Sequence, residues 1–181
     1  MPPDKGDARK PPAWATGEDG LPPLSQDELL RYSRHLILPE VGIQGQRKIK
    51  AASVLMVGAG GLGSPLGLYL AAAGVGRIGI VDFDVVDASN LQRQVLFGTP
   101  DLGRAKVDAA ADRLRALNPH VAVATVPDRV STGNVQTLVD AHDVLDARTT
   151  RGTDFFDRVD DSLHLRARGF AEVGQSAPLA Y

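Results

Sequence analysis

Four closely spaced glycines mark the stretch of this sequence whose residue types could do chemistry. They lie in Gly58-Ala-Gly60-Gly61-Leu-Gly63, between a short apolar run (54–57) and a Leu- and Ala-rich segment (65–73). A strand, a glycine turn and a helix in this order can bind a phosphate, because glycine lets bare backbone approach it and the helix start supplies free N–H groups. The alternative is a glycine turn that only packs a helix on a strand. The context favours nucleotide binding.

Two acids follow the next apolar run (77–81), which is typical of a second strand. Asp82 comes about 20 residues after the glycine turn, where a ribose-binding acid is expected. Asp84 lies two residues further on, and strand side chains alternate, so the two carboxylates would face opposite ways if the strand continued. A bend at Phe83 would instead aim Asp84 back at a cation. The sequence leaves both arrangements open.

Arg93 and Lys106 are the basic residues nearest the predicted phosphate site in the sequence. An adenylating enzyme needs such cations, because negative charge builds on the α-phosphate and on the departing pyrophosphate. An NAD-dependent oxidoreductase instead needs an open nicotinamide pocket and a proton donor. Taken singly, Arg93 could form only a loop salt bridge and Lys106 could be an exposed helix residue. Both classes of function therefore stay open on these residues alone.

The composition indicates a globular protein of one domain, with 181 residues, 43% of them hydrophobic, and a formal net charge of −2. No basic face stands out, which argues against a nucleic-acid or membrane-surface partner. There is no cysteine, and the four histidines have no metal-ligand spacing, so we expect no disulfide and no protein-bound metal site. No run could span a bilayer and no signal pattern is present, so we expect a cytoplasmic protein.

Alternating strand and helix patterns predict an α/β fold, Rossmann-like and doubly wound, with a mostly parallel sheet preceded by helices. A Pro-rich arm (1–24) is expected to be disordered, and a capping box at Ser25–Glu28 predicts a helix that ends before Pro39. The nucleotide-binding domain would occupy 25–146, and the segment 147–181 has no helical or strand period. The remaining predicted elements are a basic helix (45–52), a strand (54–57), a helix (65–73), a strand (77–81), a polar loop (82–94), a helix (100–117), a strand (121–126), a helix (133–141) and a strand (144–146).

A series of motifs occurs in order between about Leu24 and Asp146. They are Leu30-Arg-Tyr-Ser-Arg-His-Leu-Ile-Leu38, Val57-Gly-Ala-Gly-Gly-Leu-Gly63, Asp82-Phe-Asp84, Ser89-Asn-Leu-Gln-Arg-Gln94, Gly103-Arg-Ala-Lys106 and Leu117-Asn-Pro119. Together they resemble the MoeB/ThiF/HesA group of sulfur-carrier-activating enzymes, which are relatives of the ubiquitin-activating enzymes.

The resemblance implies ATP-dependent adenylation, with Mg²⁺, of the C-terminal glycine of a small ubiquitin-like sulfur-carrier protein used in molybdopterin or thiamine synthesis. By position, the four glycines would form the phosphate loop, and Asp82 would hold the ribose. Arg34 matches a helix arginine that reaches into the neighbouring subunit of the family's homodimer. Arg93 and Lys106 would contact the triphosphate. The nucleotide pocket would be lined by Asp84, Ser89, Asn90, Leu91 and Gln92.

The sequence departs from the family pattern after the last predicted strand. The family has Asp-Gly-Thr-Asp-Asn there, whose second Asp helps to hold Mg²⁺, whereas this chain continues from Asp146 into Ala147-Arg-Thr-Thr150. Loss of one base from GC-rich codons for this motif would produce the change and would put the tail after it out of frame. Alternatively, a small insertion precedes the motif, and Arg151-Gly-Thr-Asp154 corresponds to it. Either way we expect an incomplete domain of marginal stability with little or no adenylation activity. A non-catalytic nucleotide-binding remnant is therefore a further alternative.

Overall fold

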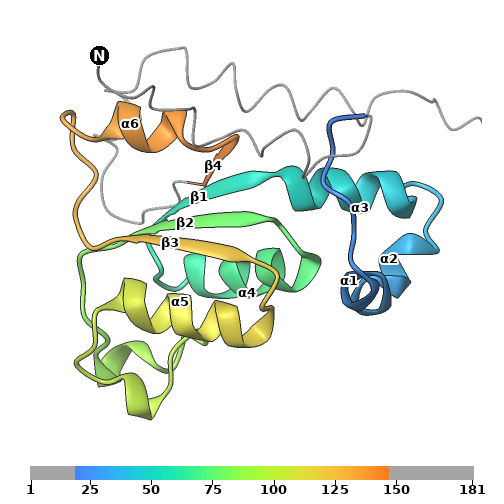
Figure 1. The fold of residues 1–181 in the computed structure, drawn as a ribbon. Helices are drawn as coiled ribbons and strands as arrows, with labels where there is room; N and C mark the ends of the chain where they lie inside the picture. The colour runs from blue at the N-terminus through green and yellow to red at the C-terminus, as the bar shows by residue number, and fades with distance from the viewer. Residues whose placement is uncertain (1–18, 147–181) are drawn as a thin grey trace, which may run out of the picture.

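The computed structural model describes residues 19–146, which form one sheet with helices on both of its faces (Figure 1). Its strands lie in the order β3-β2-β1-β4, and every neighbouring pair is parallel. The chain starts in the middle, winds outward through β2 and β3, and crosses back to place β4 on the other side of β1. This order confirms the predicted Rossmann-like α/β fold and puts the topological switch point between β1 and β4. The strands are β1 (Ser53–Val57), β2 (Arg77–Val81), β3 (Ala122–Val126) and β4 (Val144–Asp146).

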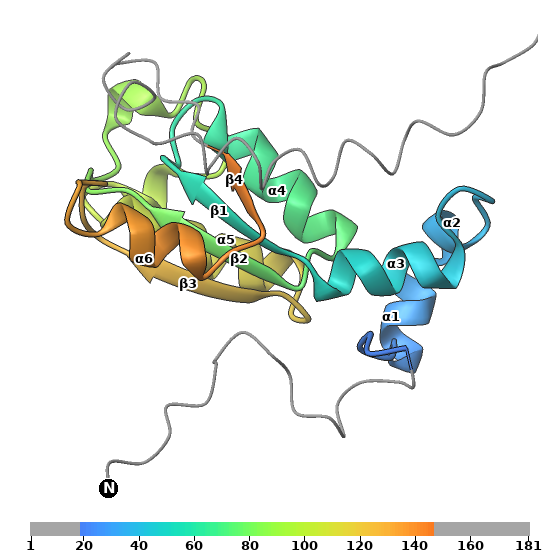
Figure 2. The same ribbon diagram turned by 90° about the horizontal axis from the view of Figure 1, so that it is seen from above.

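A helix joins each strand to the next, as parallel strands require. The helices are α1 (Gln26–Arg31), α2 (Ser33–Leu36), α3 (Gly42–Ala51), α4 (Gly63–Ala73), α5 (Lys106–Leu117) and α6 (Val135–Asp140), with 3₁₀ turns η2 (Ala88–Asn90) and η3 (Thr99–Asp101). Figure 1 shows α4 and α5 against one face of the sheet and α6 over the other. The helices α1 to α3 lie beside the sheet, where β1 begins (Figure 2). In the described residues no helix is long and apolar enough to cross a membrane.

The main hydrophobic core lies between the sheet and the pair α4 and α5. Met56 of β1 and Ile80 of β2 belong to it together with Leu114 of α5, and all three are fully buried. Helix α4 lies close to β1 because Gly67 faces the sheet: a Cβ there would be only 3.1 Å from Met56 Cε. This packing holds the start of α4, and with it the glycine turn, at the carboxyl end of β1.

The turn after α6 covers part of the opposite face. His142 lies on Gly79 of β2, where any Cβ would overlap the imidazole ring. His142 Nδ1 donates to the Leu138 carbonyl oxygen (2.8 Å), and its buried Nε2 has no hydrogen-bond partner in the described part of the chain. Burial lowers the pKa of His142 below its usual value, and the charge of Arg77 adds to the shift. The ring is therefore held in its neutral form.

Buried polar side chains attach the N-terminal helices to the carboxyl ends of α4 and α5. Gln46 of α3 is fully buried and donates to the Ala73 carbonyl oxygen (2.8 Å). Asn118, just after α5, donates from Nδ2 both to the Tyr32 hydroxyl (2.8 Å) and to the Ala71 carbonyl oxygen (2.7 Å). Because a buried polar group without its partner costs free energy, these hydrogen bonds fix where the helices sit.

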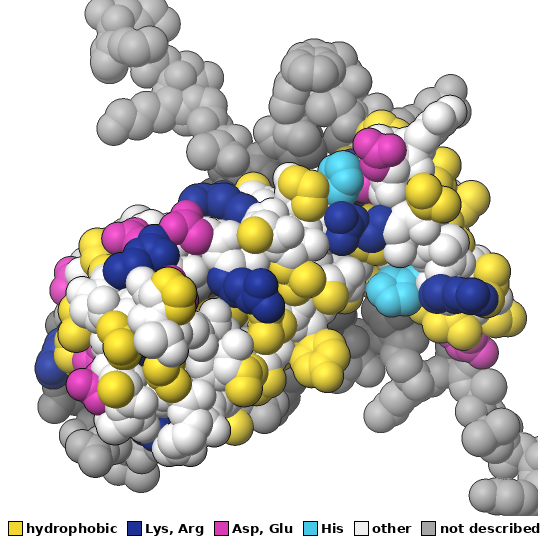
Figure 3. Space-filling model, turned by 90° about the horizontal axis from the view of Figure 1, so that it is seen from below, with side chains coloured by type: hydrophobic (Ala, Val, Ile, Leu, Met, Phe, Trp, Pro, Cys, Tyr) yellow, Lys and Arg dark blue, Asp and Glu magenta, His cyan; other side chains and the backbone are white. Residues whose placement is uncertain are grey.

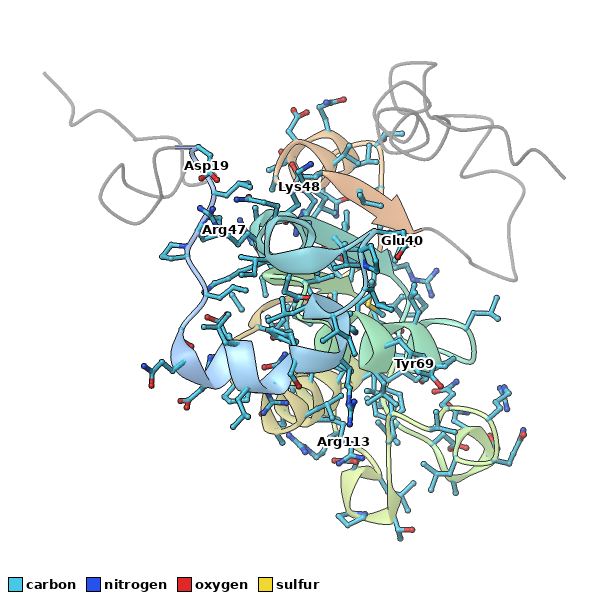
Figure 4. The ribbon with its side chains drawn as sticks, turned by 90° about the vertical axis from the view of Figure 1, so that its right-hand side faces the viewer. Asp19, Glu40, Arg47, Lys48, Tyr69 and Arg113 are labelled. Atoms are coloured by element: carbon cyan, nitrogen blue, oxygen red, sulfur yellow. The ribbon has the colours of Figure 1, made fainter. Side chains whose placement is uncertain are left out.

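The residues just before α1 are attached to α3. The Arg47 guanidinium donates to both carboxylate oxygens of Asp19 (2.6 and 2.7 Å) and to the Leu21 carbonyl oxygen (2.7 Å). Figure 4 shows the Asp19 and Arg47 side chains next to each other. The disorder expected for the arm 1–24 stays a prediction, and within its described part Arg47 contacts Asp19 and Leu21. Residues 1–18 lie outside the described part.

The structure corrects two predicted helix boundaries. The capping box forms as predicted, but the helix breaks into α1 and α2 at Tyr32, whose backbone is not helical (φ −96°, ψ 14°). The helix expected to begin at Pro100 instead begins at Lys106. The turn η3 and Gly103, with φ +78°, come between, and this φ does not allow a continuous helix. The expectations for 147–181, including the departure from the family motif, lie outside the described residues.

We predict that Tyr32→Phe lowers the free energy of unfolding by about 1 kcal/mol, the usual net contribution of a buried hydrogen bond. The change removes the hydroxyl that accepts from Asn118 and keeps the buried ring. Urea denaturation followed by circular dichroism measures the difference. Tyr69→Phe is the matched control, because Tyr69 is 76% exposed (Figure 4) and its hydroxyl has no partner among the described residues. Equal losses in both variants would contradict the prediction.

We also predict that the protein loses stability as the pH falls from about 7 toward about 5, and that His142 contributes to this loss. The folded pKa of His142 is lowered, so the unfolded chain binds a proton first, around its ordinary value of 6.5, and stability falls below that pH. Above it, both states are neutral at this position and the stabilisation is complete. Urea denaturation across this pH range should give a smaller slope for His142→Leu; an unchanged slope would show that His142 is not responsible.

Candidate nucleotide-binding site

The glycine turn lies at the carboxyl ends of β1 and β2. Gly58 has φ +96°, a conformation that other residues rarely adopt, and its N–H donates to the Val81 carbonyl oxygen (2.8 Å), which ties the turn to β2. A Cβ at Gly63 would overlap the Gly58 carbonyl oxygen, so the two ends of the turn touch through bare backbone. The tight turn therefore depends on the glycines at these two positions.

The same turn leaves a row of backbone donors free. No hydrogen bond within the described residues is formed by the N–H groups of residues 60–63, where α4 begins. The Ser64 N–H, one residue later, already donates into the helix, to the Gly60 carbonyl oxygen (2.8 Å). Free N–H groups and the positive end of the helix dipole favour an anion at this position. The geometry is suited to a phosphate.

Asp82, the predicted ribose acid, braces the turn in this structure. Its Oδ2 accepts from the Ala59 N–H (2.8 Å) and its Oδ1 accepts from the Asp84 N–H (2.9 Å). Its side chain is mostly buried, with 9% of its surface exposed. Each carboxylate oxygen has two acceptor sites, so these bonds leave capacity for ribose hydroxyls. Asp82 thus links β2, the glycine turn and the loop that follows.

The chain bends at Phe83 after β2, so Asp84 points toward a cation and does not continue the strand alternation. Phe83 turns outward, where the Arg129 guanidinium lies 3.8 Å from the centre of its ring. Asp84 Oδ2 accepts from Lys106 Nζ (3.0 Å), and its carbonyl oxygen accepts from the Lys106 N–H (2.9 Å). The Lys106 side chain is 5% exposed and the Asp84 side chain 48%. A buried ammonium group is therefore held at the start of α5 by Asp84, whose N–H donates to Asp82.

The loop segment 89–93 carries the other predicted ligands. The aliphatic part of Arg93 lies over Gly61, with Cδ 3.7 Å from where a Cβ there would be, and its guanidinium donates to the Ser89 carbonyl oxygen (3.0 Å). Ser89 donates to Asp87 through its hydroxyl and its N–H, and both bonds hold the pKa of the Asp87 carboxyl below its usual value. Asn90 and Leu91 are half-buried, and Gln92 is exposed. The structure thus brings Arg93 to the glycine turn.

Gln94 is a residue of this site that the sequence reasoning did not select. It is 4% exposed, and its Nε2 lies 3.7 Å from the position that a Cβ on Gly60 would take. Its Oε1 is buried without a hydrogen-bond partner in the described part of the chain. The only signal in the sequence is its place at the end of the segment 89–94, and a sequence does not reveal burial in an irregular loop.

A match to a known protein family covers most of the described residues. The model of the ThiF family matches residues 32–156. The chain belongs to the ThiF family. It is 53% identical over 133 residues to the probable adenylyltransferase/sulfurtransferase MoeZ of Mycobacterium tuberculosis, covering 74% of this chain and 33% of MoeZ. It is 56% identical over 128 residues to the adenylyltransferase and sulfurtransferase MOCS3 of Sus scrofa, covering 69% of this chain and 28% of MOCS3.

Solved structures similar to this ThiF-family chain contain nucleotides. The E. coli tRNA N6-threonylcarbamoyladenosine dehydratase TcdA in complex with ATP matches with a TM-score of 0.63 and 30% identity, over 70% of this chain and 53% of TcdA. E. coli MccB with ATP matches with a TM-score of 0.63 and 27% identity, over 70% of this chain and 39% of MccB. The chain spans about a third of the length of the two curated relatives above.

Arg34 is the predicted site residue that the ThiF-family fold does not bring to the others. It is exposed on α2 and has no partner among the described residues. The neighbouring helix α3 is attached through Gln46 to Ala73, the last residue of α4, whereas the glycine turn lies at the first. Arg34 is thus placed at the wrong end of α4 to contact a nucleotide bound by its own chain.

We predict that Gly63→Ala destabilises the protein by about 2 kcal/mol or more, because the added methyl group forces the backbone of the turn apart. Gly60→Ala is the matched control, since a Cβ there has only ordinary contact with Gln94, at 3.7 Å, and its φ is not positive. Thermal and urea denaturation compare the two variants. Equal stability of Gly63→Ala and Gly60→Ala would show that the close approach of Gly63 and Gly58 is not required.

Proposed function

We propose that this ThiF-family chain carries the ATP-binding part of an enzyme that adenylates the C-terminal glycine of a ubiquitin-like sulfur-carrier protein. One observation carries the proposal: a helix start with free N–H groups lies beside Arg93, and Asp82 and Asp84 link it to the buried Lys106. Backbone donors bind phosphate in many folds, but two cations next to them suit a reaction that releases pyrophosphate. The names of the relatives, adenylyltransferases that are also sulfurtransferases, support the same reaction.

In the proposed reaction Asp82 accepts hydrogen bonds from the ribose hydroxyls while it holds the turn. The free N–H groups of 60–63 bind the phosphates. A carboxylate oxygen of the carrier's terminal glycine attacks the α-phosphorus, and the bond from that phosphorus to the oxygen bridging the β-phosphate breaks. Pyrophosphate leaves with the electron pair, and an acyl adenylate forms. Arg93 and Lys106 stabilise the charge on the outer phosphates as it builds.

Lys106 is suited to this role because its charge is already compensated. Its ammonium group is almost fully buried, and Asp84 supplies the counter-charge at 3.0 Å. A buried cation needs such a partner, and Asp84, half exposed, can turn away from Lys106 when the phosphates arrive. Lys106 can then exchange one anionic partner for another without becoming unpaired.

Mg²⁺ would enter this site with the nucleotide. Among the described residues no three His, Asp or Glu side chains are grouped to hold a metal. This fits Mg²⁺, which is commonly bound by one or two carboxylates together with substrate phosphates. The ion would supply further neutralisation of the phosphate charge, and half-exposed Asp84 is the described carboxylate best placed to accompany it.

The partner and the pathway are also proposals. A ubiquitin-like carrier of the molybdopterin or thiamine pathway follows from the resemblance, and the similar structure of E. coli MccB, solved with MccA-N7isoASN, supports a partner of this general kind. A second copy of the chain would complete the site through Arg34. Leu30 and Ile37 near it are 78% and 67% exposed, and Figure 3 shows hydrophobic side chains on the face that includes α4 and α5. Both features support a homodimer.

We predict that ATP raises the melting temperature of the 181-residue chain and that NAD at the same concentration does not. Arg93→Ala should reduce the ATP-induced shift, because it removes a cation beside the phosphates. Arg113→Ala is the matched control, since Arg113 is exposed on α5 and has no partner in the described part of the chain. A melting-temperature shift with NAD in place of ATP would favour an oxidoreductase and overturn the proposal.

Pyrophosphate exchange then separates catalysis from binding. With ATP and a sulfur-carrier protein, incorporation of labelled pyrophosphate into ATP reports formation of the acyl adenylate. Exchange that is lost in Lys106→Met would support the proposed reaction. Binding of ATP with no exchange would instead assign this chain to the non-catalytic nucleotide-binding class.

A further inference from the structure

Gln94 has a buried carboxamide that the folded chain leaves without a hydrogen bond. The side chain is 4% exposed, Oε1 has no partner, and Nε2 bonds to none of the described residues. The backbone, in contrast, is satisfied: the N–H donates to the Asn90 carbonyl oxygen (2.9 Å), and the carbonyl oxygen accepts from the Phe97 N–H (3.1 Å). The loop conformation therefore does not depend on the carboxamide.

An apolar side chain of the same size would avoid this cost. Burying a polar group without a hydrogen bond is unfavourable, and Met or Leu would fill the same volume without that penalty. The residues that follow, Leu96 and Phe97, are both buried in the hydrophobic core, so the surroundings would accept an apolar neighbour. A ligand that accepts a hydrogen bond from Nε2 would give the carboxamide a role that Met or Leu cannot fill.

The position of Gln94 beside Gly60 indicates which phosphate of a nucleotide it would contact. Asp82, the proposed ribose acid, accepts from the Ala59 N–H, and Gly60 is the next residue along the turn. The phosphate attached directly to that ribose would lie at Gly60, beside Gln94 Nε2. Arg93, by contrast, lies over Gly61, one residue further from the ribose. Gln94 would then face the α-phosphate, and Arg93 would face the phosphates beyond it.

We propose that Gln94 is a nucleotide-binding residue whose Nε2 donates a hydrogen bond to a non-bridging oxygen of the α-phosphate. This inference rests on the proposed ATP site and adds a contact to it. The α-phosphorus is the atom that the carrier carboxylate attacks. A donor held rigidly at its oxygen orients that centre and stabilises the charge that builds there.

The test compares AMP and ATP binding to the wild-type chain and to Gln94→Met by calorimetry. Both nucleotides contain the α-phosphate, so the variant should bind each about tenfold more weakly, by the same factor, as expected for one lost hydrogen bond to a charged group. Arg93→Ala should weaken ATP more than AMP. Without nucleotide, Gln94→Met should melt at the same temperature as the wild type or higher, because an unpartnered polar group has been removed. A purely structural role would lower it.

Gln136→Met is the matched control, since Gln136 is an exposed glutamine on α6, across the sheet from α4. A measurement on the wild type needs no variant: the side-chain NH₂ signals of Gln94 in ¹⁵N-labelled protein should shift when AMP is added. If Gln94→Met bound AMP and ATP as tightly as the wild type, or if the Gln94 NH₂ signals did not shift with AMP bound, the proposed role of Gln94 would be overturned. The proposed ATP site would still stand. Failure of the wild type to bind either nucleotide would overturn the ATP site and this inference together.

Discussion

The candidate site depends on the two hydrogen bonds that the Asp82 carboxylate accepts. One comes from the glycine turn and the other from the loop after β2, so a single side chain joins the turn to that loop. The second bond also sets the bend that turns Asp84 toward Lys106. Loss of the Asp82 carboxylate would remove a support from the glycine turn and from Asp84, and through Asp84 from the ammonium group of Lys106. Asp82, the acid proposed to bind ribose, therefore has a structural role before any nucleotide is bound.

Residues of the family-like motifs divide into two groups at opposite ends of α4. Near its first residue they surround the glycine turn and leave donors free for a ligand. Near its last residue, Tyr32 and Asn118 join Gln46 in using buried hydrogen bonds to attach the N-terminal helices. The side chains of Tyr32, Asn118 and Gln46 are buried in these bonds, so their function is to hold the fold, whereas Arg34, in the same motif as Tyr32, is exposed and has no partner among the described residues. The resemblance to the family does not separate these roles, because its motifs contain residues of both groups.

The parts of the fold governed by local patterns were predicted from the sequence. The strands and α4 follow apolar runs and glycines, and the capping box at Ser25 has its own short signature. The break at Tyr32 was not predicted; its side chain is buried and its hydroxyl bonds to Asn118, 86 residues away, a contact that no local pattern reports. The late start of α5 follows from the left-handed backbone of Gly103. Gln94 was missed because its burial depends on how an irregular loop packs, which no sequence period reports.

The candidate site residues lie in two places, around the glycine turn and on α2. All the groups around the glycine turn come from residues 58–106, so the proposed phosphate and ribose contacts would need only one chain. Arg34 lies beyond the far end of α4, an eleven-residue helix about 16 Å long. No rotamer of Arg34 spans that length, and its helix is held in place because Gln46, which donates to the Ala73 carbonyl oxygen, also hydrogen-bonds to His35 Nδ1 (2.9 Å) on α2. A role for Arg34 at a nucleotide would therefore require the site of another copy, whereas the proposed phosphate and ribose contacts would not.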